Sequence, residues 1–169
     1  SGAELASRLD RLPSTRRVVA WNVSSGSFTR HRNDFARLLA ALKPDIVLLD
    51  ELPGEITVAE IESWLASAPL AALGAWRVVL GGTGGVQRSA VATRGYPTEP
   101  APSLASVPYP EGALASLAGT PDAADAPLPA AEDRRGVSTA GAWIELDGRR
   151  VLFVAADFQS GGWPGSLRD

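Results

Sequence analysis

Hydrophobic and polar positions along residues 17–51 predict a strand, a helix and a second strand, in that order. Residues 18–23 (VVAWNV) are mostly β-branched or aromatic and too few for a helix, which is typical of a buried strand. The polar residues 24–27 predict a loop. An apolar stripe at helical spacing follows, and it consists of Phe35, Leu38, Leu39 and Leu42. Residues 46–49 (IVLL) are continuously apolar, as expected of a strand covered on both faces.

Two polar side chains stand at the ends of these two strands. A strand-helix-strand unit of this length predicts a right-handed parallel crossover, so Asn22 and Glu51 should share one edge of the sheet. A carboxylate and an amide oxygen there suit Mg²⁺, which uses few protein ligands. The alternative is that Asn22 caps a turn and Glu51 is a solvated strand end. Polar residues at strand ends are common, so spacing alone favours this alternative.

The rest of the chain predicts one more helix and several strands. Thr57 and Glu60 have the spacing of a capping box, ahead of a helix that runs to about residue 67. Strands are expected over residues 76–80 and 88–94, and in a hairpin of residues 140–146 and 151–158. The expected shared face of the second of these strands comprises Ser89, Val91 and Thr93.

Residues 95–135 have a different composition, rich in Pro, Ala, Ser and Asp, with little periodicity. So long a stretch without regular structure inside a compact domain indicates either a flap over the site or a partly disordered insertion. We therefore expect one partial domain over residues 1–169, with a flexible Pro/Ala-rich insertion at 95–135.

Two motifs resemble the opening motifs of the endonuclease/exonuclease/phosphatase superfamily: Trp21-Asn22, and PDIVLLDE at residues 44–51. The resemblance covers residues 16–94 and 136–169. It implies an α/β fold, the four-layer sandwich of the DNase I-like type, with this chain forming about its N-terminal half. It also implies that Glu51 is the principal ligand of Mg²⁺ (or Mn²⁺ or Ca²⁺) and that Asn22 assists. Asp50 stands where the superfamily usually has glutamine.

The same resemblance assigns three further residues. Gln87 and Arg88 come just before a strand, where polar groups of the superfamily often face the scissile phosphate; the alternative is that they are surface residues. Asp157 stands where a catalytic or phosphate-contacting histidine is usual. An aspartate cannot be a cationic phosphate ligand at neutral pH, but it can bind metal or accept a proton. A solvated strand end is the alternative for Asp157.

The composition of the chain limits which substrates and binding sites are expected. The chain has 16 Lys and Arg against 19 Asp and Glu, a net charge of −3, which argues against a basic nucleic-acid footprint. A small phosphoester or a phospholipid head group is therefore expected before duplex DNA. Without cysteine there is no disulfide or thiolate-metal site. No apolar run approaches the roughly 18 residues of a membrane span. Ser1 is not an initiating methionine, and Ser1-Gly2 could be the remnant of a tag or could follow a removed signal peptide. A secreted or periplasmic location is expected before a cytoplasmic one.

Superfamily motifs expected later in the chain, G-D-x-N and S-D-H, are not in this sequence. Half a sandwich should leave the inner face of its sheet uncovered. At about 25 cal/mol per Å², exposing several hundred Å² would cost roughly 10 kcal/mol. We therefore expect a complement, either a C-terminal half of the same polypeptide or another copy. The complete protein is expected to be a metal-dependent phosphoesterase; the alternative is a non-catalytic binding module on the same fold.

Overall fold

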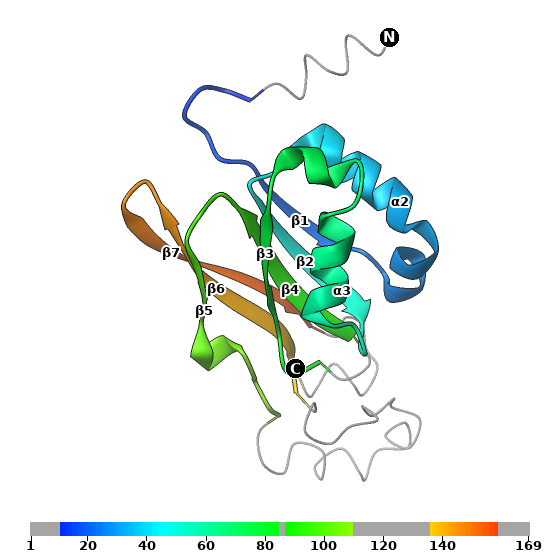
Figure 1. Cartoon of the computed structure of the whole chain (residues 1–169). Helices are drawn as coiled ribbons and strands as arrows, with labels where there is room; N and C mark the ends of the chain where they lie inside the picture. The colour runs from blue at the N-terminus through cyan, green and yellow to red at the C-terminus, as the bar shows by residue number, and fades with distance from the viewer. Residues whose placement is uncertain (1–10, 85–86, 110–135, 159–169) are drawn as a thin grey trace, which may run out of the picture.

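The computed structural model describes residues 11–84, 87–109 and 136–158, which form two β-sheets and the helices that cover one of them (Figure 1). The elements in chain order are β1 (Val18–Asn22), α2 (Ser25–Leu42), β2 (Ile46–Pro53), α3 (Val58–Leu65), η1 (Leu70–Leu73), β3 (Trp76–Leu80), β4 (Gln87–Arg94), β5 (Thr98–Pro100), η2 (Pro102–Leu104), β6 (Ser138–Leu146) and β7 (Arg149–Asp157). The first sheet has the strand order β1-β2-β4-β3 and the second the order β5-β6-β7.

The predicted crossover is confirmed, because β1 and β2 are parallel neighbours joined by α2. The helix begins at Ser25, so the prediction of a loop over residues 24–27 is wrong. The physical reason is Phe28, which is fully buried and meets the Trp64 ring edge-on at 5.0 Å between centroids. Burial of this ring draws the polar residues before it into the first helical turn, where the Phe28 N–H bonds the Ser24 carbonyl at 2.9 Å.

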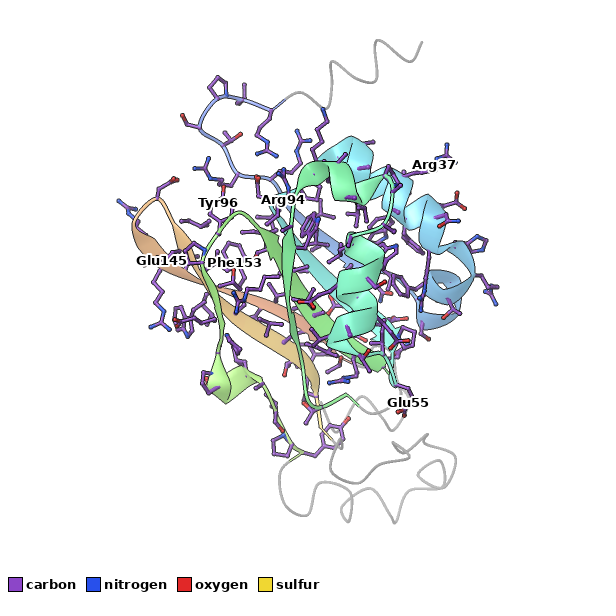
Figure 2. The ribbon with its side chains drawn as sticks, viewed as in Figure 1. Arg37, Glu55, Arg94, Tyr96, Glu145 and Phe153 are labelled. Carbon is purple, nitrogen blue, oxygen red and sulfur yellow. The ribbon has the colours of Figure 1, made fainter. Side chains whose placement is uncertain are left out.

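The helices cover one face of the first sheet and the second sheet covers the other (Figure 1). Helix α3 starts at the predicted capping box, with the Thr57 and Glu60 side chains each bonding the other residue's backbone N–H. Between the two sheets, buried side chains of β4, β6 and β7 form a separate core, against which Phe153 packs (Figure 2). The layers therefore run helix, sheet, sheet among the described residues.

The prediction that the inner sheet face would lie uncovered is wrong for most of the first sheet. Strands β5 to β7 of the same chain supply the cover, because alternate residues of β6 are apolar and face β4. The inner face stays open at β1, where Val18 is 44% exposed and Ala20 is also exposed. On the outer face of β7, Leu152 and Val154 are 39% and 37% exposed. A fourth layer remains a prediction.

The segment predicted as a flexible insertion begins in ordered structure. Residues 95–109 contain β5, which pairs with β6, and the short helix η2. Residues 110–135 lie outside the described residues, so the prediction stands untested there. Among the helices that the structure describes, none is long and apolar enough to cross a membrane.

Candidate active site

Several strand ends meet at one end of the two sheets. The C-terminal ends of β1, β2 and β7 lie there with the starts of β4 and β6, as the strand registers require. Figure 2 shows the end of β2 near Glu55, while Arg94 marks the opposite end of β4. Asn22 pairs directly with Asp50, so the sequence correctly predicted that β1 and β2 bring their polar ends to a common edge.

Glu51 is the centre of this edge, because two amide side chains converge on its carboxylate. The Asn22 Nδ2 donates to Glu51 Oε1, and the Gln87 Nε2 donates to Glu51 Oε2 at 3.1 Å. The Asn22 Oδ1 accepts from the Ser24 N–H at 3.1 Å, which fixes the amide plane. Asn22, Glu51 and Gln87, predicted from three separate segments, are therefore one hydrogen-bonded group.

A β-bulge in β2 presents Glu51. The register between β2 and β4 shifts between Leu49 and Leu52, which is the signature of a bulge. Within it, Asp50 and Glu51 together lie opposite the single residue Ser89 of β4. Glu51 has a φ of 55°, in the left-handed region that costs a residue with a Cβ roughly 1–2 kcal/mol. Backbone strain of this kind is concentrated at functional sites.

The bulge changes the face on which Glu51 stands. Leu49 and Leu52 are both buried in the core under the helices. Strict alternation from Leu49 would place Glu51 on that helix-covered face as well. Instead, Glu51 contacts Gln87, which is two residues from Ser89 in β4 and so shares its face toward the second sheet. The bulge therefore brings two consecutive carboxylates, Asp50 and Glu51, to the same side of the sheet.

Asp50 is anchored beneath Glu51, a role that the sequence did not predict. Its Oδ1 accepts from Ser89 Oγ at 2.8 Å, and Ser89 Oγ lies 2.8 Å from Ser138 Oγ of the second sheet. Burial raises the pKa of the Asp50 carboxyl above its ordinary value; the Ser89 hydrogen bond opposes this rise and the neighbouring Glu51 charge adds to it. The only sequence signal was that Ser89 lies on the face shared with Val91.

Arg88 lies at the site but is directed into the scaffold. Its Nε donates to the Gly81 carbonyl at 2.9 Å and its Nη1 to the Ile56 carbonyl at 3.1 Å, while Nη2 also bonds Gly81. These bonds tie the start of β4 to the segments after β2 and β3. The predicted phosphate contact of Arg88 stays a prediction, and Gln87 is the member of the pair that reaches Glu51.

Asp157 reaches the same end of the molecule from the second sheet. It is the last residue of β7, half-buried, and pairs in register with Ser138 of β6. Residues directly opposite in an antiparallel pair share a face, so Asp157 lies on the face whose Ser138 hydroxyl contacts Ser89. The structure thus brings the predicted catalytic aspartate to the rim that carries Glu51, on a different sheet.

The donor set can be tested against a divalent cation. Across residues 11–84, 87–109 and 136–158, no three His, Cys, Asp or Glu side chains gather as a ligand group. A cation here would therefore have one principal carboxylate, Glu51, supported by amides. Mg²⁺ is commonly held by one or two carboxylates together with waters and substrate phosphate oxygens, so the residues present fit it.

No protein-family model and no curated protein matches the chain. Solved structures do match. TDP2 from Caenorhabditis elegans has a TM-score of 0.52 at 13% identity, over 95% of this chain and 42% of that one. D. rerio TDP2 complexed with a single strand DNA product gives 0.51 at 14%, over 88% and 48%. An endonuclease/exonuclease/phosphatase from Beutenbergia cavernae DSM 12333 gives 0.51 at 18%, over 87% and 39%.

These similarities show that the chain shares the mixed α/β fold of TDP2 and of endonuclease/exonuclease/phosphatase proteins. The chain spans about half the length of these solved structures, or less.

Proposed function

We propose that this chain carries the metal-binding part of a metal-dependent phosphoesterase, with Glu51 as the principal ligand. One observation supports this most directly. Glu51 stands on a left-handed bulge at the sheet edge, and both of its carboxylate oxygens accept hydrogen bonds from amides on neighbouring strands. Hydrogen bonds from the surrounding residues orient metal-binding carboxylates in this way.

Each residue of the group has a separate task in this proposal. Glu51 would hold Mg²⁺ (or Mn²⁺ or Ca²⁺), and Asn22 would assist as a second ligand through its Oδ1 while its Nδ2 fixes the direction of Glu51 Oε1. Gln87 fixes Oε2 and has a second amide hydrogen with which to contact a phosphoryl oxygen. When bound, the cation supplies charge neutralisation on the phosphoryl oxygen and on the departing oxygen.

Asp157 takes the position of the superfamily's usual histidine. At neutral pH an aspartate can accept a proton from a water molecule but cannot donate one to a phosphate ester. We therefore assign it the role of proton acceptor on the second sheet, across the rim from Glu51. With a net charge of −3, the favoured substrate is a small phosphoester or a phospholipid head group, with nucleic acid second.

Further polypeptide is part of the proposal. The open inner face at β1, with Val18 44% exposed, and the partly exposed Leu152 and Val154 on β7 leave apolar surface for another segment. The matching solved structures have chains about twice as long or more. We propose that a C-terminal half of the same protein packs there and completes the rim.

The test is hydrolysis of bis(4-nitrophenyl) phosphate by the full-length protein with Mg²⁺ or Mn²⁺. Glu51→Gln keeps the size of the side chain and removes its charge, and we expect it to lower the rate at least about 100-fold. Glu62→Gln, on an exposed position of α3, is the matched control and should leave the rate unchanged. Full activity of Glu51→Gln would remove the assignment. Absence of hydrolysis, and of any thermal shift by Mg²⁺ that EDTA reverses, would favour the non-catalytic alternative.

A further inference from the structure

Asp50, the other residue of the bulge, is held from two neighbouring strands. Its backbone carbonyl accepts from the Val23 N–H at 3.0 Å, just beyond the end of β1. Its side-chain Oδ1 accepts from Ser89 Oγ on β4 at 2.8 Å. Because Asp50 immediately precedes Glu51, these two bonds fix the position of the backbone just before the left-handed Glu51.

Ser89 extends this connection to the second sheet. It is fully buried, and its Oγ lies 2.8 Å from the Ser138 Oγ and 3.1 Å from the Ser138 carbonyl oxygen. A hydroxyl has one proton to donate. When Ser89 donates its proton to Asp50, the Ser138 hydroxyl can donate to Ser89. The three side chains then form a row of hydrogen bonds from Ser138 through Ser89 to Asp50. Ser138 is the register partner of Asp157, so these hydrogen bonds connect Asp50 to the strand pair that carries Asp157.

We infer that Ser89 and Asp50 form a clamp that positions Glu51, with Asp50 acting as a hydrogen-bond acceptor and not as a metal ligand. The clamp bonds the Asp50 side chain of the bulge to β4, in addition to the bond between Glu51 and Gln87. The inference rests on the proposed role of Glu51 as ligand. It goes beyond that role because it assigns function to a buried serine and to a carboxylate that the site does not otherwise use.

The experiment measures Mn²⁺ affinity of the full-length protein by electron paramagnetic resonance. Ser89→Ala and Asp50→Ala each remove the clamp bond, and each should weaken Mn²⁺ binding about 10-fold, the lower end for residues that orient a ligand. The double variant should be no weaker than either single variant, because both changes remove one interaction. Asp50→Asn keeps an oxygen that can accept from Ser89, so it should retain most of the affinity.

Thr93→Val is the matched control for Ser89→Ala. Thr93 is also fully buried on β4, and its Oγ1 lies 2.6 Å from Thr98 Oγ1 of the second sheet, at the end of β4 away from Glu51. The control should lower the melting temperature as Ser89→Ala does, but leave Mn²⁺ affinity unchanged. A second readout is the pair of Glu51 Cα and Cβ chemical shifts, which report its left-handed φ. These shifts should change in Ser89→Ala and stay unchanged in the control Thr93→Val.

The possible outcomes distinguish a failure of the clamp inference from a failure of the proposed function. If Glu51→Gln weakens Mn²⁺ binding while Ser89→Ala behaves like Thr93→Val, the clamp is wrong and the proposed function stands. If Asp50→Asn loses as much affinity as Glu51→Gln, Asp50 is a ligand and the clamp is again wrong. Unchanged affinity in Glu51→Gln contradicts the proposed function itself. Should Ser89→Ala fail to fold, Asp50→Ala tests the same bond at a half-buried position.

Discussion

Replacing Glu51 by glycine should stabilise the protein relative to alanine while both changes remove the candidate metal ligand. Glu51 has a φ of 55°, where a Cβ costs roughly 1–2 kcal/mol and glycine is unstrained. Against this, glycine loses about 0.5–1 kcal/mol more backbone entropy than alanine on folding. At the midpoints of these two ranges, Glu51→Gly is more stable than Glu51→Ala by about 0.75 kcal/mol. The carboxylate and its bonds to Asn22 and Gln87 are lost equally in both variants.

The assay is thermal and urea unfolding of the two variants in the full-length protein without divalent cations. For a chain of 150–250 residues, 1 kcal/mol corresponds to about 2–4 °C in melting temperature and to less in a longer chain, so Glu51→Gly should melt higher by up to about 4 °C. The control pair is Glu62→Gly and Glu62→Ala on the exposed face of α3, where glycine should be about 1 kcal/mol the less stable. The same order at both positions would refute the left-handed bulge and the strain argument with it.

Three further predictions concern Asp50, the pair Gln87 and Arg88, and Lys43. At neutral pH Asp50→Asn should melt above the wild type, because burial raises the pKa of Asp50 in the folded state; the advantage should shrink as the pH falls below that raised pKa, and an advantage independent of pH would contradict the burial argument. Arg88→Lys loses the guanidinium fork and should destabilise by about 1–3 kcal/mol with little change in KM, whereas Gln87→Ala should raise KM with little loss of stability; the reverse pattern would favour the predicted phosphate contact of Arg88. Lys43→Gly should raise stability by about 0.5–1 kcal/mol in urea unfolding, because Lys43 ends α2 with a left-handed φ of 49°, and a loss there would contradict that conformation.

The strands and helices that position the candidate site could be predicted from the sequence. Apolar periodicity placed β1, α2 and β2, and the crossover rule then required Asn22 and Glu51 to share an edge, as their hydrogen bond shows. Helix α3 could be predicted from its capping box because that signal is local. The apolar residues Ala140, Ala142 and Ile144 alternate in the sequence, and all three are buried between the two sheets.

The bulge and the inter-sheet contacts could not be predicted from the sequence. Nothing in the run LLDEL marks Glu51 as left-handed, since glycine or asparagine is the usual signal at such a position. The Ser89–Ser138 contact joins residues 49 apart on different sheets, and its register depends on how the sheets pack. The sequence places Arg88 at the start of β4, and this position led to the predicted phosphate contact. The sequence does not give the direction of the side chain, which bonds the Gly81 carbonyl.

The bulge also helps to choose between the two interpretations that spacing alone left open. A solvated strand end does not require a left-handed glutamate, a half-buried aspartate or two consecutive carboxylates on one face, and each of these lowers the stability of the metal-free chain. Single substitutions, such as an amide at Asp50 or glycine at Glu51, would relieve them. A bound divalent cation would offset the repulsion between the carboxylates, and at 100 times its Kd it would add about 2.7 kcal/mol of stability. A bound cation would compensate for this loss of stability at Glu51, the residue on which two amides converge. The unfavourable conformation and charges therefore favour a cation-binding site at Glu51 over a solvated strand end.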